Sequence, residues 1–150
     1  MENNKATIET LNDLVLINND RIRGYEDALK ELGEDDDNLR PLFLEMIDQS
    51  KRFKLQLGTE VEVLGSDMKQ GTSTSGKLHR TWLELKAAFT GHSEKSILEE
   101  CEFGEDAIKK AYNSALEDDS TPAYLRDILE DQLGQLSDSH DEIKALRDNA

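Results

Sequence analysis

The stretch ATIETLNDLVLINNDRIRGYEDALKEL, residues 6–32, decides the fold class of this chain. Its apolar side chains recur at intervals of three or four residues, the spacing that gathers them on one face of an α-helix. The residues in this frame are Ile8, Leu11, Val15, Ile22, Leu29 and Leu32, and Gly33 follows as a helix stop. We therefore expect a long amphipathic helix over residues 6–32, with an apolar face that packs against the rest of the chain.

Three further stretches show the same periodicity and predict three more long helices. These helices are expected over residues 39–64, 93–117 and 122–147. Gly65 marks the end of the first, and Thr121 followed by Pro122 forms an N-cap and first-turn pair for the last. Each of the four expected helices is about 25 residues, or roughly 38 Å, long. Helices of similar length without strands are typical of α-helical bundles.

The connection between the second and third long helices differs from the other loops. Residues 66–76 are polar and contain glycines, which predicts a loop, whereas residues 78–89 carry an apolar frame that predicts a short helix. The connection is long enough to run the length of the bundle, as one connection does in ferritin-like folds. We therefore predict an all-α, ferritin-like four-helix bundle with a short extra helix in this crossover. An up-down-up-down bundle with a broken third helix stays open as an alternative.

Composition and charge indicate a single domain over residues 1–150. Hydrophobic residues make up 36% of the chain and no apolar run approaches the roughly 18 residues that cross a bilayer, so we expect no membrane contact. The net charge of −15 repels nucleic-acid phosphates, and we expect no nucleic-acid partner. A single cysteine, Cys101, allows no intramolecular disulfide, and no secretion signal is recognisable. We therefore expect a cytoplasmic protein.

Several stretches carry a resemblance to a known family. They are LNDL at residues 11–14, NNDRIRGYE at 18–26, SGKLHRTW at 75–82, EECEFGED at 99–106 and HDEI at 140–143. Over nearly its whole length the chain resembles an uncharacterised bacterial family of small four-helix-bundle proteins. That family is grouped with ferritin-like folds and is known only as a domain of unknown function. The resemblance implies the fold and implies no established activity.

A ferritin-like fold raises the question of a metal site. Such sites take a Glu from each of two helices and a Glu-x-x-His from each of the other two, since residues three apart share a helix face. The full motif is missing, because the residues three before His79, His92 and His140 are Gly76, Phe89 and Ser137. If the two middle long helices run opposite to the outer two, a partial set of ligands lies at one level of the bundle. This predicted metal set is Glu26, Glu99, Glu100 and His140.

Other polar residues in the apolar frames have structural interpretations. Asn18 and Ser50 lie near the middle of their helices, and we expect them to fix the helix register through buried hydrogen bonds. Cys101 follows an apolar frame, which predicts a buried and inert thiol. Residues 71–78 nearly match a phosphate-binding loop, but Leu78 stands where a Ser or Thr must hold magnesium. We therefore predict no catalytic residues and no organic cofactor.

Two functional hypotheses of different classes follow from these observations. The first is a non-catalytic, stress-associated or interaction domain that contacts an unidentified protein partner or a second copy of itself. The second is a carboxylate and histidine site that binds iron or a similar divalent metal for oxidation or sequestration. The two are separated by an inward-facing carboxylate on the helix over residues 39–64, which the sequence does not supply, and by whether Glu26, Glu100 and His140 converge in the structure.

Overall fold

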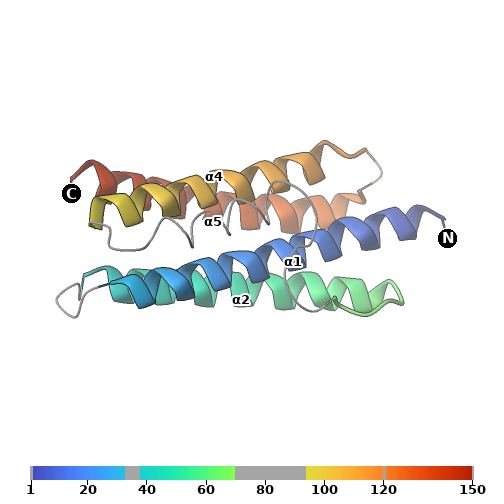
Figure 1. The fold of residues 1–150 in the computed structure, drawn as a ribbon. Helices are drawn as coiled ribbons and strands as arrows, with labels where there is room; N and C mark the ends of the chain where they lie inside the picture. Colours follow the sequence, from blue (N-terminus) through green and yellow to red (C-terminus); the bar gives the residue numbers. More distant parts are fainter. Residues whose placement is uncertain (1, 33–37, 70–93, 120, 150) are drawn as a thin grey trace.

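Four long helices form the part of the chain that the structure describes (Figure 1). This computed structural model describes residues 2–32, 38–69, 94–119 and 121–149. The helices are α1 (Glu2–Glu31), α2 (Leu39–Val63), α4 (Glu94–Glu117) and α5 (Ala123–Asp148). No strand occurs in these ranges, and the predicted all-α fold class is confirmed. The short helix expected over residues 78–89 lies outside the described residues.

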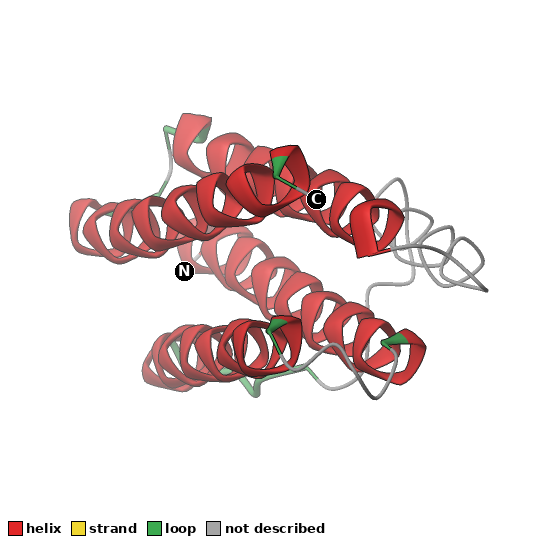
Figure 2. Cartoon of the chain, turned by 90° about the vertical axis from the view of Figure 1, so that its left-hand side faces the viewer, coloured by secondary structure: helices red, strands yellow, loops and turns green. Residues whose placement is uncertain are grey.

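The helices pack as a bundle in which neighbouring helices run in opposite directions (Figures 1 and 2). Helix α1 packs against α2 and α4, and α4 packs against α5. Hydrogen bonds between Gln132 and Gln56 and between Ser139 and Gln49 join α5 to α2. Helices α2 and α4 run in the same direction, so α2 ends at the opposite end of the bundle from the start of α4 (Figure 1). The predicted crossover requires this relation, whereas an up-down-up-down bundle would require α2 and α4 to be antiparallel.

The core is built from the apolar helix faces that the sequence predicts. One cluster of buried side chains surrounds Tyr25 and Phe43, whose ring centroids lie 5.3 Å apart. A second cluster surrounds Phe53 and Tyr112. Each cluster contains residues from all four helices, so burial of apolar side chains holds all four helices together at both ends of the bundle. None of the described helices combines the length and the apolarity that crossing a membrane requires.

The end of α2 follows the prediction made from Gly65. This glycine has a φ of +90°, the left-handed conformation that glycine adopts without a steric penalty. Its N–H donates to the carbonyl of Glu62 at 2.9 Å, and the N–H of Ser66 donates to the carbonyl of Val61 at 3.1 Å. These two bonds are the Schellman pair that satisfies the last carbonyls of a helix.

The start of α5 differs from the prediction. Pro122, with φ −59° and ψ 151°, is the N-cap residue, and no side chain caps the helix. The predicted Thr121 cap is wrong because its hydroxyl instead donates to the carbonyl of Ala115 at 3.4 Å, back in α4. The guanidinium of Arg126 also donates to the carbonyl of Leu116, at 2.6 Å. The turn between α4 and α5 is therefore held by contacts to the end of α4 rather than by a cap on α5.

Candidate functional site

A fully buried ion pair crosses the interior of the bundle. Arg21 of α1 and Glu105 of α4 both have side chains with no exposed surface. The Nε of Arg21 donates to Oε1 of Glu105 at 2.9 Å, and Nη2 lies 2.9 Å from the same oxygen. The remaining nitrogen, Nη1, donates to the hydroxyl of Ser50 on α2 at 2.9 Å. One guanidinium thus ties three helices together at a single level.

Tyr25 completes this interior group. Its hydroxyl donates to the same Oε1 of Glu105, and its ring lies 5.5 Å from Cζ of Arg21. Burial acts to lower the pKa of Arg21, but the charge and hydrogen bond of Glu105, together with the two nearby tyrosines, raise it by more in sum, so the pKa is raised. Burial, together with the charge of Glu105, raises the pKa of Tyr25 well above its usual value of 10.0. Arg21 therefore stays charged and Tyr25 stays protonated inside the bundle.

A second polar layer lies beside the ion pair. The side-chain amide of Asn18 donates to the hydroxyl of Tyr112 at 2.9 Å, and that hydroxyl donates to Oε1 of Gln132 at 2.6 Å. The amide of Gln132 donates in turn to Oε1 of Gln56 at 2.9 Å. This chain runs through all four helices, and with the bond from Arg21 to Ser50 it confirms the expectation that Asn18 and Ser50 make buried hydrogen bonds.

The charge of the buried Glu105 carboxylate is balanced from within the chain. Glu105 is fully buried and already faces the guanidinium of Arg21, so its charge is balanced by the chain itself. Cys101, one turn before Glu105, is buried as predicted, and burial raises the pKa of its thiol well above 9.0. This thiol is held in its unreactive, protonated form. We assign the interior group a structural role in fixing how the helices align.

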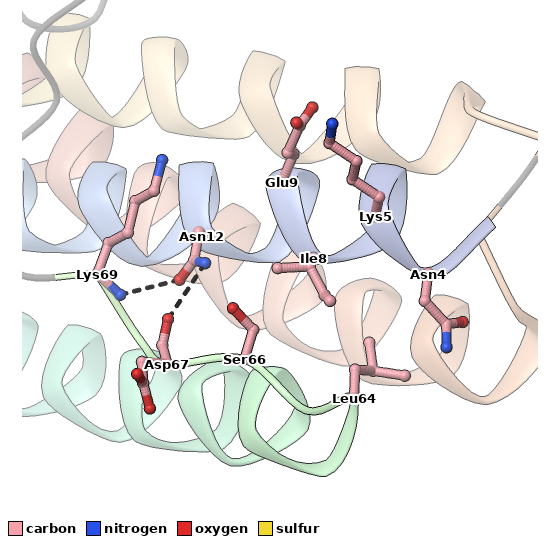
Figure 3. Close-up of a pocket in the computed structure, with 9 residues that line it drawn as sticks. All are labelled: Asn4, Lys5, Ile8, Glu9, Asn12, Leu64, Ser66, Asp67 and Lys69. Carbon is pink, nitrogen blue, oxygen red and sulfur yellow. Dashed lines mark hydrogen bonds between the residues drawn. The ribbon is translucent and has the colours of Figure 1, made fainter. Parts of the chain in front are cut away.

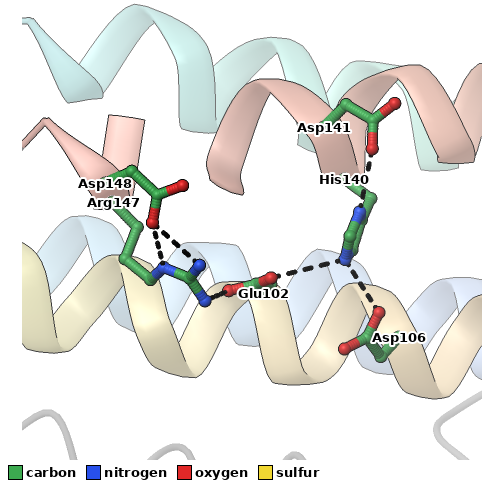
Figure 4. A network of polar contacts seen from close by, with 6 residues as sticks. All are labelled: Glu102, Asp106, His140, Asp141, Arg147 and Asp148. Atoms are coloured by element: carbon green, nitrogen blue, oxygen red, sulfur yellow. Dashed lines mark hydrogen bonds and ion pairs between the residues drawn. The ribbon is translucent and has the colours of Figure 1, made fainter. Parts of the chain in front are cut away.

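A different group of ligand-type side chains is shared between α4 and α5 (Figure 4). Glu102 and Asp106 lie one turn apart on α4, and His140 of α5 points between them. The Nε2 of His140 is 2.8 Å from Oδ1 of Asp106 and 3.6 Å from Oε1 of Glu102. One donor atom from each residue lies within 4.8 Å of the others. Among the described residues this is the one group of its kind, and we name it the Glu102 cluster.

The spacing of the donor atoms suits a tetrahedral metal. Zinc binds nitrogen and oxygen ligands at about 2.0–2.1 Å, so ligand atoms at the corners of a tetrahedron lie about 3.3 Å apart. The measured separations from His140, 2.8 Å and 3.6 Å, fall on either side of that value. The cluster is only partly enclosed, since Glu102 and His140 are each 12% exposed and Asp106 is 53% exposed.

Further charged residues surround the cluster. Asp141 lies 3.2 Å from Nδ1 of His140, close enough to accept a hydrogen bond from Nδ1 when Nε2 binds a metal. Arg147 pairs with Oε2 of Glu102 and, at 2.9 Å, with Asp148. Four carboxylates therefore accompany one imidazole and one guanidinium (Figure 4). This excess of negative charge favours a divalent cation.

Comparison with known proteins identifies the family to which the chain belongs. The model of the family described as "Domain of unknown function (DUF2383)" matches residues 6–118, which is more than half of the chain. This chain belongs to the DUF2383 family. No curated protein matches it. The match includes Arg21 and Glu105 of the interior pair and both carboxylate ligands of the Glu102 cluster, whereas His140 lies beyond the matched residues.

The four predicted metal ligands do not come together in the structure. His140 lies in the Glu102 cluster, but Glu26, Glu99 and Glu100 are not members of it. Glu26 and Glu99 are exposed, and Glu100 is half-buried. The carboxylates that face His140 come instead from the next turn of α4. Their signal in the sequence is the four-residue spacing between Glu102 and Asp106, which puts two carboxylates on one helix face.

The sequence also contains a signal for the burial of Arg21. Leu14, Asn18, Arg21, Tyr25 and Ala28 follow one another at intervals of three and four residues, and all five are buried. A charged residue within an inward-facing frame needs an opposite charge from another helix. Sequence spacing does not say which helix supplies it.

A shallow groove at the other end of the bundle has a structural explanation (Figure 3). It has a volume of about 470 Å³ and lies where the segment after α2 passes over α1. The Oδ1 of Asn12 accepts a hydrogen bond from the backbone N–H of Lys69 at 3.0 Å, and its amide donates to the carbonyl of Asp67 at 3.5 Å. Asn12 thus fastens this segment to α1, and the groove brings together no group of metal ligands among the described residues.

Proposed function

We propose that this protein is a non-catalytic, ferritin-like helical domain that binds a first-row divalent cation through Glu102, Asp106 and His140. The main support is that Nε2 of His140 lies 2.8 Å from a carboxylate oxygen of Asp106 and 3.6 Å from one of Glu102, both on the neighbouring helix. The antiparallel pairing of neighbouring helices, with α2 and α4 parallel, supports the ferritin-like assignment. The three side chains lie between α4 and α5 and are partly exposed, whereas the Arg21 ion pair occupies the bundle interior.

The donor set indicates the class of ion. Imidazole suits zinc, iron, copper and nickel, whereas carboxylates also bind magnesium, calcium and manganese. One nitrogen and two oxygens on a compact frame therefore favour Zn²⁺ or Fe²⁺ over Ca²⁺ and Mg²⁺, which take mostly oxygen ligands. Three protein ligands leave a coordination position for water or for a side chain of a partner. Asp106, being half exposed, leaves the cluster open to solvent on that side.

Binding at this site would join α4 to α5 near the C-terminal end of the chain. The ligands of α4 are only one turn apart, while His140 comes from the neighbouring helix. An ion bound only by the folded state stabilises it by about 2.7 kcal/mol at a concentration 100 times the Kd. Metal binding would therefore strengthen the α4–α5 pairing rather than create a reaction centre.

The interaction hypothesis remains a prediction within this proposal. Its support is a set of large apolar side chains that stay exposed on α2, α4 and α5 of the described chain. They are Leu44, Leu55, Val63, Phe103, Tyr124 and Leu146. A non-catalytic domain that contacts a protein partner, or a second copy, is the remaining function if no ion binds.

The experiment is a calorimetric titration of chelator-treated protein with Zn²⁺ and, without oxygen, with Fe²⁺. Wild type should bind one ion per chain, and His140→Ala and Glu102→Gln should each weaken binding at least about tenfold. Glu142→Gln is the matched control, because it removes an exposed carboxylate from α5 outside the cluster. Unchanged far-UV circular dichroism of the metal-free variants shows that they fold.

Two results contradict the proposal. Wild type that binds neither ion stoichiometrically has no such site. Equal binding by wild type, His140→Ala and Glu102→Gln places the ion elsewhere on the chain.

A further inference from the structure

The two oxygens of the Glu102 carboxylate have different partners. Its Oε1 faces Nε2 of His140 at 3.6 Å, whereas Oε2 contacts Nη1 of Arg147 (Figure 4). The Glu102 side chain is only 12% exposed, so solvent does not compete freely for either oxygen. One oxygen of this carboxylate is therefore directed at the metal position and the other is held by a guanidinium.

Arg147 also contacts its neighbour in the sequence, Asp148. Its Nη2 and Nε donate to Oδ1 of Asp148 at 2.9 Å and 3.2 Å. Arg147 follows His140 by two helical turns, so both project from the same face of α5 toward α4 (Figure 4). Helix α5 thus supplies one ligand of the cluster and also the group that orients a ligand on α4.

Resting on the proposed function, we infer that Arg147 is a positioning residue that makes Glu102 bind through one oxygen. A carboxylate with one oxygen held by a guanidinium does not readily turn to bind a metal through both. Binding through one oxygen suits a small four-coordinate ion such as Zn²⁺. It disfavours Ca²⁺, which takes six to eight oxygens and commonly uses both oxygens of a carboxylate. Arg147 therefore determines the specificity of the site as well as its affinity.

A purely electrostatic role for Arg147 predicts the opposite result. A guanidinium near a divalent cation repels it, so removal of the charge alone would tighten binding of every cation. Removal of an orienting partner instead weakens binding, commonly by 10- to 100-fold, because the ligand loses its fixed direction. The sign of the change in Kd separates the two roles.

The test compares Arg147→Gln, Arg147→Lys and the wild type in titrations with Zn²⁺ and Ca²⁺. Arg147→Gln should weaken Zn²⁺ binding about tenfold and leave Ca²⁺ binding equal or tighter, so the preference for Zn²⁺ falls. Arg147→Lys keeps the charge but lacks the planar fork, and it should restore only part of the preference. Lys144→Gln removes an exposed cation from α5 and is the matched control, with less than a twofold effect.

A spectroscopic readout reports the coordination directly. With Co²⁺ in place of Zn²⁺, the visible absorption of a four-coordinate site is strong, and it weakens when a fifth ligand atom binds. Arg147→Gln should lower this absorption because Glu102 becomes free to bind through both oxygens. A structural role in holding the end of α5 would leave the spectrum unchanged.

The outcomes distinguish this inference from the proposed function. Tighter Zn²⁺ binding by Arg147→Gln, an equal loss for both ions, or an unchanged Co²⁺ spectrum overturns the positioning role while the site stands. Wild type that binds none of the three ions overturns the site and the positioning role together.

Discussion

Replacing Arg21 by methionine tests the buried ion pair at the centre of the bundle. Methionine keeps much of the length of the arginine side chain and removes its charge and its donors. Arg21 makes two contacts to Glu105 and donates to Ser50, with no exposed surface on either charged side chain. After the substitution, Glu105 keeps only the hydrogen bond from Tyr25, and its other oxygen, Oε2, has no partner among the described residues.

The expected cost follows from this geometry. Removing one partner of a buried ion pair typically destabilises a protein by about 3–5 kcal/mol, because it leaves an uncompensated charge in the interior. Arg21→Met should fall in this range, and so should Glu105→Leu, which leaves the guanidinium uncompensated. The double substitution removes both charges and should cost no more than either single one. A coupling energy of about 3 kcal/mol between the two positions is therefore expected.

The assay is urea unfolding at neutral pH, followed by far-UV circular dichroism. Domains of this size have unfolding free energies of about 5–15 kcal/mol, so a loss of 3–5 kcal/mol shifts the midpoint measurably. Arg23→Met is the matched control, because Arg23 lies on the same helix but is exposed. That variant should stay within about 0.5 kcal/mol of wild type.

Two results would refute the reasoning. If Arg21→Met costs no more than Arg23→Met, the buried guanidinium contributes nothing to stability. If the double variant costs the sum of the single ones, the two charges do not compensate each other.

Two further predictions concern helix glycines and alkaline pH. Gly134→Ala should raise stability by about 1 kcal/mol, because a Cβ there meets no atom within 4 Å and alanine favours helix; Gly58→Ala should gain less, because its Cβ meets the side chain of Met68. Thermal unfolding compares the two, and an equal gain would contradict the role of Met68. Burial raises the pKa of Tyr25 and Tyr112 above 10.0, so the folded state keeps protons that the unfolded state releases. The contribution of the two tyrosines to the free energy of unfolding should be fully present below about pH 10. Above that pH the free energy of unfolding should fall by up to about 1.4 kcal/mol per pH unit for each tyrosine, and less steeply in Tyr112→Phe. Urea unfolding from pH 7 to 11 measures this. In a Tyr124→Phe background, which removes the exposed tyrosine, tyrosinate absorption near pH 10 from still-folded protein would count against it.

The helices could be predicted because their cause is local. The apolar frame that begins at Ile8 and the glycine at residue 65 act through spacing and backbone conformation, which the sequence displays directly. The expected start of the first helix, at residue 6, was less accurate, since α1 begins at Glu2. Helix ends depend on weak local preferences, and the N-cap at Pro122 rather than Thr121 shows how a tertiary contact overrides them.

The candidate site could be predicted only in part. Arguments from helix length place residues at a level along the bundle, and His140 was selected in this way. They say much less about the direction in which a side chain points around the helix axis. That direction determines which carboxylates face the imidazole of His140. Glu102 and Asp106 face it because of how α4 and α5 are rotated against each other, which depends on the packing of both helices.

The long amphipathic helices of this chain can be read from its sequence, and the lengths of the helices and of one connection indicate how they are joined. Periodicity is a property of neighbouring residues, so it needs no knowledge of partners. The meeting of Arg21 with Glu105 in the interior, and of His140 with Glu102 and Asp106 between α4 and α5, follows from the three-dimensional packing alone. Such pairings join residues far apart in the chain, and they arise from helix rotation and register, which are set by the packed core as a whole.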